Sequence, residues 1–107
     1  MTTTTEDILD QLSTLIMDLG SLREQAADAT DRAAINNQIM ALSKWWRKLD
    51  DLRAAEPKPG LAEAKVALEG IVTDIKQEKK KLENVADIIY KAAKAIAIAE
   101  KVAKLVA

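Results

Sequence analysis

An apolar stripe that recurs every seven residues runs from Leu61 to Val106 without a change of phase, and it limits what this chain can fold into. One heptad position carries Leu61, Leu68, Ile75, Leu82, Ile89, Ile96 and Ala103, and the position three residues later carries Ala64, Ile71, Glu78, Val85, Ala92, Ala99 and Val106. An apolar repeat of this period is typical of α-helices that pack side by side. The pattern therefore predicts helix over most of the C-terminal half, with Glu78 as the polar member of the stripe.

The stripe does not show directly whether residues 61–106 form one helix or two. A tight turn between two helices usually uses a glycine to end the first helix, and neither Gly nor Pro follows Gly70. The unbroken phase and the missing cap favour a single helix of about 70 Å that is continuous or bends near residues 78–81. The alternative is a pair of helices that turn at the charged run 76–81.

Two shorter stripes precede this segment. The first comprises Ile8, Leu12, Leu15, Leu19, Leu22, Ala26 and Ala29, and the second, one residue out of register, comprises Ile35, Ile39, Leu42, Trp46 and Leu49. One residue corresponds to about 100° around a helix, so a straight helix would turn one stripe away from its partner. The pattern predicts a break near Asp28–Asp31, with Thr30 as the cap of the second helix. Helices over about 5–29 and 31–55 would then form an αα-hairpin.

Two prolines and a glycine in the segment EPKPG, residues 56–60, end the hairpin and form a short, stiff connection to the C-terminal stripe. At the other end, a disordered start over residues 1–4 leads to a helix cap at Thr4 or Thr5. Hydrophobic residues make up 49% of the chain and charged residues 31%, a mixture typical of amphipathic helices. We therefore expect a single all-α domain over residues 1–107, with the hairpin packed on the long helix in a coiled-coil-like helical bundle.

Charge is unevenly distributed, although the net charge is only −1. Residues 1–31 contain seven acidic residues and one arginine, whereas residues 76–107 contain eight lysines and four acidic residues. The simplest interpretation is that an acidic first helix lies beside a basic last one, because charge patterning is usually a property of solvated faces. The other interpretation is a basic tail that meets an anionic surface.

The chemistry available to the chain is narrow. It contains neither Cys nor His, so it lacks thiolate zinc ligands, the commonest general base and the commonest transition-metal ligand. Gly20, Gly60 and Gly70 stand alone and form no phosphate-binding loop, and no serine has a histidine to activate it. We expect a protein that is not an enzyme and that uses no cofactor, no metal and no small-molecule substrate.

The length mismatch between the hairpin and the long helix points to a function. Hairpin helices of about 36 Å would cover only half of the long helix. The rest of its apolar stripe needs a cover, which could be the chain folding back, a second copy or another protein. We therefore predict a protein–protein interaction or self-assembly module, most simply a homodimer.

The predicted partner or self-association face lies on the C-terminal part of the long helix. It comprises Ile89, Ala92, Ile96, Ile98, Ala99, Val102, Ala103 and Leu105. Two of these, Ile98 and Leu105, lie away from the main seam, so they would suit a second partner.

Two alternative functions use the lysines. The segment Val85–Ala107 could lie on a membrane surface with its lysines outward, as in a toxin-like protein. It is too charged to span a bilayer and lacks the Trp and Phe anchors that interfacial helices usually carry. Nucleic-acid binding through the Lys76–Lys81 run has less support, because acidic residues dilute the run and no aromatic residue is interleaved for stacking.

The adjacent residues Trp45 and Trp46 are two of only three aromatic residues in the chain. Trp46 occupies a position of the second stripe between Leu42 and Leu49, so it is predicted to be core. Trp45 lies at helical spacing from Leu49 and Leu52 on the flank of that stripe. The pair is thus predicted to be mainly architectural, with Trp45 kept as a candidate binding hot spot.

The beginning of the sequence, MTTTTEDIL, lacks the basic and apolar regions of a secretory signal. No stretch of the sequence is apolar enough to predict a transmembrane segment. A cytoplasmic location is the resulting expectation, and secretion by a non-classical route stays open.

Overall fold

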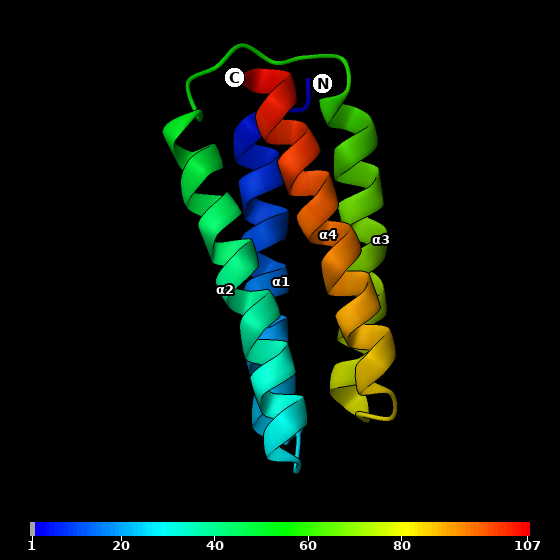
Figure 1. Cartoon of the computed structure of the whole chain (residues 1–107). Coiled ribbons are helices and arrows are strands. Elements are labelled where there is room, and N and C mark those ends of the chain that lie inside the picture. The colour runs from blue at the N-terminus through cyan, green and yellow to red at the C-terminus, as the bar shows by residue number, and fades with distance from the viewer. Residues whose placement is uncertain (1) are drawn as a thin grey trace.

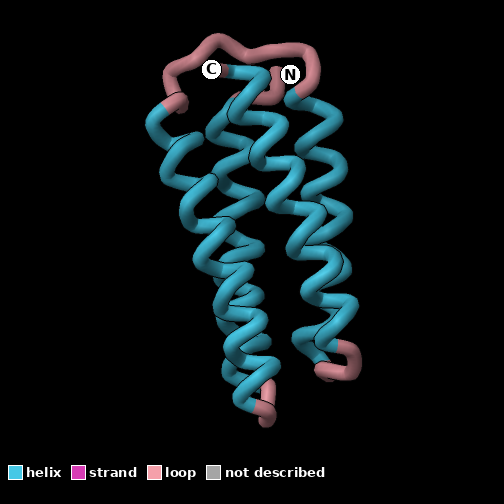
Figure 2. Tube along the Cα trace, viewed as in Figure 1, coloured by secondary structure: helices cyan, strands magenta, loops and turns pink. Residues whose placement is uncertain are grey.

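The computed structural model describes residues 2–107, and within them it contains four α-helices and no strand. The helices are α1 (Thr5–Gln25), α2 (Ala29–Asp51), α3 (Leu61–Lys80) and α4 (Val85–Val106). They pack side by side into an elongated bundle whose backbone measures 43 × 22 × 17 Å (Figures 1 and 2). The predicted all-α helical bundle is confirmed.

The predicted break between the first two helices is confirmed, but its cap lies two residues earlier than expected. Asp28 is the N-cap of α2, and its carboxylate accepts the backbone N–H of Thr30 at 2.6 Å. Thr30, the expected cap, lies inside the first turn. α1 ends at Gln25 rather than at residue 29, and α2 ends at Asp51 rather than at residue 55 because residues 52–55 form tight turns.

The prediction of one long helix over residues 61–106 is wrong. α3 ends at Lys80 and α4 begins at Val85, with a chain reversal between them. A polar cap starts the second helix, because the side chain of Asn84 accepts the backbone N–H of Asp87 at 3.1 Å. Among the described residues no φ angle is positive, so the turn does not need the glycine whose absence favoured a continuous helix.

The four helices form a ring in which sequence neighbours are not always spatial neighbours. α1 packs against α2 and α3, and α4 packs against the same two helices. Because the chain reverses at every connection, α1 and α3 run in the same direction, as do α2 and α4 (Figure 1). α2 and α3 lie diagonally opposite each other, and the connection over residues 52–60 crosses the end of the bundle at which both chain ends lie.

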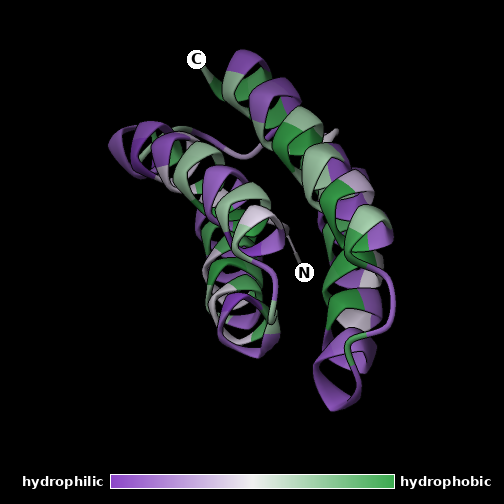
Figure 3. Cartoon of the chain, turned by 60° about the horizontal axis from the view of Figure 1, so that its bottom comes forward, coloured by the Kyte–Doolittle hydropathy of each residue, from purple (hydrophilic) through white to green (hydrophobic). Residues whose placement is uncertain are grey.

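Every helix turns one apolar stripe toward a common core (Figure 3). The largest fully buried side chains are Ile8, Leu9, Leu12, Leu15, Leu19, Leu22, Ile35, Leu42, Leu49, Leu61, Leu68 and Ile75. The contribution of α4 differs, because Ala92, Ala95 and Ala99 are completely buried. The distance between helix axes depends on the side chains at the contact, so these alanines allow α4 to pack closely against its neighbours.

A buried carboxylate ties α1 to α3. Asp18 on α1 has a side chain that is only 5% exposed, and it pairs with Lys79 at 2.9 Å and Lys76 at 3.2 Å. Nearby, the side-chain amide of Gln25 donates to the backbone carbonyl of Lys79 at 2.9 Å. A buried charge is costly unless it is paired. The acidic first helix therefore lies beside the basic end of α3, and not beside α4, which is diagonally opposite.

Replacing Asp18 by Asn should lower the free energy of unfolding by about 1–2 kcal/mol, because a charge-assisted bond is lost while the lysines can turn to solvent. Urea denaturation measures this change. Asp10→Asn, at an exposed position of the same helix, is the matched control and should change the free energy by less than about 0.5 kcal/mol. Equal effects of the two substitutions would contradict a structural role for Asp18.

The start of α1 is held by a reciprocal capping box. The Thr4 hydroxyl accepts the backbone N–H of Asp7 at 3.3 Å, and the Asp7 carboxylate accepts the backbone N–H of Thr4 at 2.8 Å. Thr4, rather than Thr5, is thus the cap, and residue 1 of the expected disordered start lies outside the described residues. The bond from the Thr4 N–H lowers the pKa of Asp7 below its ordinary value of 3.8.

The capping box makes stability depend on pH in the acid range. Because the pKa of Asp7 is lower in the folded state than its ordinary value of 3.8, its contribution is complete above that value and is lost as the pH falls through the folded pKa. The stability difference between the wild-type chain and Asp7→Asn should therefore shrink below pH 3.8. Thermal unfolding monitored by circular dichroism between about pH 6 and about pH 2.5 tests this, with Asp10→Asn as the control.

Candidate interaction surface

Contacts at the two ends of the α3–α4 hairpin fix how the two helices are aligned along each other. At one end Gly60 lies against Leu105, since a Cβ atom at Gly60 would come within 2.8 Å of the Leu105 side chain. At the other end Lys91 of α4 bridges Asp74 of α3 at 3.5 Å and Asp87 of its own helix at 2.9 Å. The hydrogen bond to Asp87 raises the pKa of Lys91 above its ordinary value, and the bridge from Lys91 to Asp74 holds this end of the hairpin.

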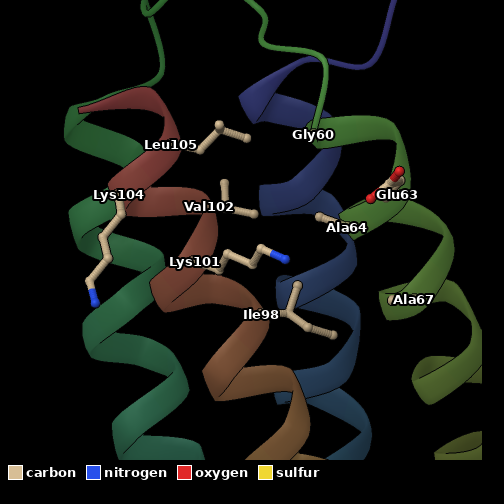
Figure 4. Close-up of a pocket in the computed structure, with 9 residues that line it drawn as sticks. All are labelled: Gly60, Glu63, Ala64, Ala67, Ile98, Lys101, Val102, Lys104 and Leu105. Carbon is tan, nitrogen blue, oxygen red and sulfur yellow. The ribbon is translucent and has the colours of Figure 1, made fainter.

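Between these two ends lies a groove with a volume of about 510 Å³. It is lined by Gly60, Glu63, Ala64, Ala67, Ile98, Lys101, Val102, Lys104 and Leu105 (Figure 4). The α3 wall consists mainly of small residues, whereas the α4 wall carries the larger apolar side chains of Ile98, Val102 and Leu105. The groove exists because short side chains on α3 leave the long side chains of α4 partly uncovered.

Two charged residues line opposite walls of this groove. Figure 4 shows Lys101 extending from α4 toward α3, with Glu63 on the α3 wall. Both residues are exposed, and neither makes an ion pair within residues 2–107. Lys104 differs, because it pairs with Glu100 at 3.5 Å on its own helix. The groove is thus an apolar surface with one free cation and one free anion on opposite walls.

The structure divides the predicted partner face between the core and the surface. Ala92, Ala99, Val102 and Ala103 are buried in the bundle of their own chain, and Ile89 and Ile96 are half-buried against its core. The sequence-based face assumed a long helix with an uncovered half, whereas the chain reversal folds that half back. Of the eight residues, Ile98 and Leu105 lie in the groove as accessible side chains, together with the edge of Val102.

The α3 wall of the groove was not predicted. Glu63, Ala64 and Ala67 face Ile98 and Leu105 only because the chain reverses after α3. In a continuous helix these two sets of residues would lie about 50 Å apart. The pattern that could have revealed them is the Asn84 cap, since Asn is a preferred N-cap residue.

The tryptophan pair packs on the hairpin of α1 and α2. Trp46 is half-buried, and its indole N–H donates to Ser13 Oγ at 2.8 Å and to the Leu9 carbonyl at 3.2 Å. Trp45 is also half-buried against the core, with the Lys44 ammonium 5.9 Å from the ring centroid. Trp46 was predicted to lie in the core, and the structure places it at the edge of the core instead.

A second, more open groove of about 460 Å³ lies beside Trp46 on the α1–α2 side. It is lined by Ser13, Ile16, Met17, Ser43, Trp46 and Arg47, and Met17 is 72% exposed. This side of the ring lies opposite the α3–α4 groove. Trp45, the candidate hot spot, does not line it.

The lysine run before the α3–α4 turn is partly neutralised, because three of its four lysines share two carboxylates. Lys76 and Lys79 pair with Asp18, and Lys81 lies 3.5 Å from Glu83. Only Lys80 of the run has no ion pair among the described residues. A nucleic-acid-binding patch needs several free cations along one face, and this arrangement gives such a patch little support.

Metal sites, membrane spans and relatives are the other features that bear on function. No group of three or more acidic side chains there is arranged to hold a metal ion. No helix over residues 2–107 combines the length and the apolar character needed to cross a membrane. No protein-family model, no curated protein and no solved structure matches the chain.

The different environments of the two tryptophans predict an asymmetry in stability. Trp46→Ala should lower the free energy of unfolding by about 3 kcal/mol, because it removes a large ring and two hydrogen bonds to α1. Trp45→Ala should cost about 1–2 kcal/mol, because that ring makes no such bonds. Chemical denaturation of the two variants measures both values. A larger loss for Trp45→Ala would show that the flank of the α2 stripe, and not Trp46, holds the hairpin together.

Proposed function

We propose that this chain is a non-enzymatic self-association module that forms a homodimer through the α3–α4 groove. The observation that carries the proposal is the groove itself: an apolar strip presented by Ile98 and Leu105, with the buried Val102 at its floor, beside small residues and between two unpaired charges. Apolar surface with a polar rim is the usual anatomy of a protein interface. The helices that form this surface are fixed by the core, so the surface is available without rearrangement.

The size of the face supports a weak, reversible dimer. Two adjacent helices of twenty residues present a face about 30 Å long and about 20 Å wide, or about 600 Å² per protomer. Stable complexes usually bury about 800 Å² per partner, and smaller interfaces are typical of transient contacts. We therefore expect a dissociation constant in the micromolar range.

The membrane-surface alternative has weaker support. The apolar stripe of α4 is turned into the core, which leaves Tyr90 (59% exposed) and Leu105 (38% exposed) as its exposed large apolar side chains. Interfacial helices bury a continuous apolar face in the lipid, so α4 would have to leave the bundle to bind in that way. Sedimentation with anionic liposomes at low salt is the measurement that would favour this alternative.

Ala67→Lys should abolish self-association while leaving the fold intact. Ala67 is an exposed helical position that lines the groove, so an ammonium group there is solvated in the monomer and loses its water in the dimer. Light scattering coupled to size-exclusion chromatography, at loading concentrations from about 5 to about 300 µM, should show a monomer–dimer equilibrium for the wild type and only monomer for the variant.

Ala33→Lys is the matched control, because it places the same side chain at an exposed position of α2. This control should dimerise as the wild type does. A wild-type chain that stays monomeric across the concentration range would overturn the proposal. Loss of the dimer in both variants would place the interface elsewhere.

A further inference from the structure

We infer that the two copies in the dimer are related by a two-fold axis that runs along the α3–α4 groove, so that Glu63 of each copy pairs with Lys101 of the other. This inference rests on the proposed self-association and specifies its geometry. It identifies Glu63 and Lys101 as the residues that determine how, and with which partner, the groove associates.

The charges on the two edges of the groove have opposite signs. Along the α3 edge, Glu63 and Asp74 lie on the side that faces α4, eleven residues and therefore three turns apart. Along the α4 edge, Lys94 and Lys101 follow at helical spacing on the side that faces α3, whereas Lys91 is already paired with Asp74 of its own chain. The charges left for a second copy are therefore negative on the α3 edge, at Glu63, and positive on the α4 edge, at Lys94 and Lys101.

A two-fold dimer can use this face in two ways. If the axis runs along the groove, α3 of one copy lies over α4 of the second copy, and each acidic edge meets a basic edge. If the axis lies in the interface but across the groove, α3 lies over α3 and α4 over α4. The second arrangement opposes acid to acid and lysine to lysine. Like charges that face each other across an interface disfavour it, so the charges select the axis along the groove.

The register of the hairpin supports the same pairing. Glu63 and Lys101 line one groove near the same end of the bundle, between the Gly60–Leu105 contact and the middle of the helices. A two-fold axis along the groove leaves the level of each residue unchanged, so Glu63 of one copy meets Lys101 of the second copy at that level. α3 and α4 run in opposite directions, so each helix packs antiparallel to its new neighbour. The axis across the groove would also give antiparallel pairs, so the helix dipoles suit both arrangements equally.

Apolar contacts complete this arrangement. The large side chains Ile98 and Leu105 of one copy come to lie over the α3 wall of the second copy, where Ala64 and Ala67 leave space. The axis across the groove would instead place large side chains on large side chains. Shape and charge therefore favour the same axis.

Charge reversal in two separate chains tests the inference. The variants Glu63→Lys and Lys101→Glu each place like charges opposite each other at both symmetric contacts of a homodimer. Each variant alone should dimerise roughly tenfold more weakly than the wild type, since two exposed ion pairs become repulsive. An equimolar mixture should form a heterodimer of wild-type affinity, because one chain then carries lysine at both groove positions and meets a chain that carries glutamate at both. Native mass spectrometry resolves the three dimers once one variant is isotope-labelled.

Restoration in the mixture separates contacts between chains from contacts within one chain. An ion pair within one chain would make the single variants weak and leave the mixture equally weak, which would overturn the inference. Unchanged dimerisation of both single variants would also overturn it. The wild type is measured in parallel. A monomeric wild type would show that the proposed dimer itself does not form, whereas a dimeric wild type with unaffected variants would show that only the Glu63–Lys101 pairing is wrong. Raising NaCl from about 50 mM to about 500 mM should weaken the wild-type dimer, because exposed ion pairs are screened.

Discussion

A buried carboxylate and the lysines that neutralise it set the arrangement of this bundle. Asp18 is withdrawn from water inside the contact between α1 and α3, where Lys79 and Lys76 supply the compensating charge. Burying an unpaired carboxylate would be strongly unfavourable. A helix with cations at this level is therefore favoured beside α1, and α3 supplies them with Lys76 and Lys79. With α3 beside α1, α4 takes the place beside α2, and the connection between the hairpins has to cross the end of the bundle.

The same arrangement decides which surfaces stay open. The alanines of α4 allow it to pack closely into the ring, which buries most of its apolar stripe and leaves Ile98 and Leu105 on the flank toward α3. The α3 wall opposite them is made of small residues, so the flank is not covered. The candidate interface is therefore a consequence of side-chain size on two facing helices. The negative charge at this interface comes from acidic residues on the side of α3 that faces α4. Two lysines of α3, Lys76 and Lys79, lie instead on the side that faces α1 and pair with Asp18.

Much of the fold could be predicted from the sequence, because the heptad stripes directly record which side of each helix is buried. The break near Asp28 followed from a change of register. The reversal after Lys80 was missed because the stripe keeps its phase through the turn, so register gave no signal there and only the short Asn84 cap marks the new helix. Ile98 and Leu105 were identified because they lie off the seam. Glu63 and Ala67 could not be identified, since their relation to α4 depends on a contact between segments far apart in sequence.

The ring order also divides the contacts of this chain into those between residues close in sequence and those between residues far apart in sequence. The contacts nearest the turn of each hairpin, such as Arg23–Asn36 and Asp74–Lys91, close short loops, whereas the Lys79–Asp18 bond between hairpins joins residues 61 positions apart. Closing a long loop costs more chain entropy and has to occur before the distant contacts contribute. The hairpins should thus form early and dock late, with the proline-containing connection setting how they meet. The docking of the two hairpins, rather than the formation of either one, is therefore the step that closes the longest loops.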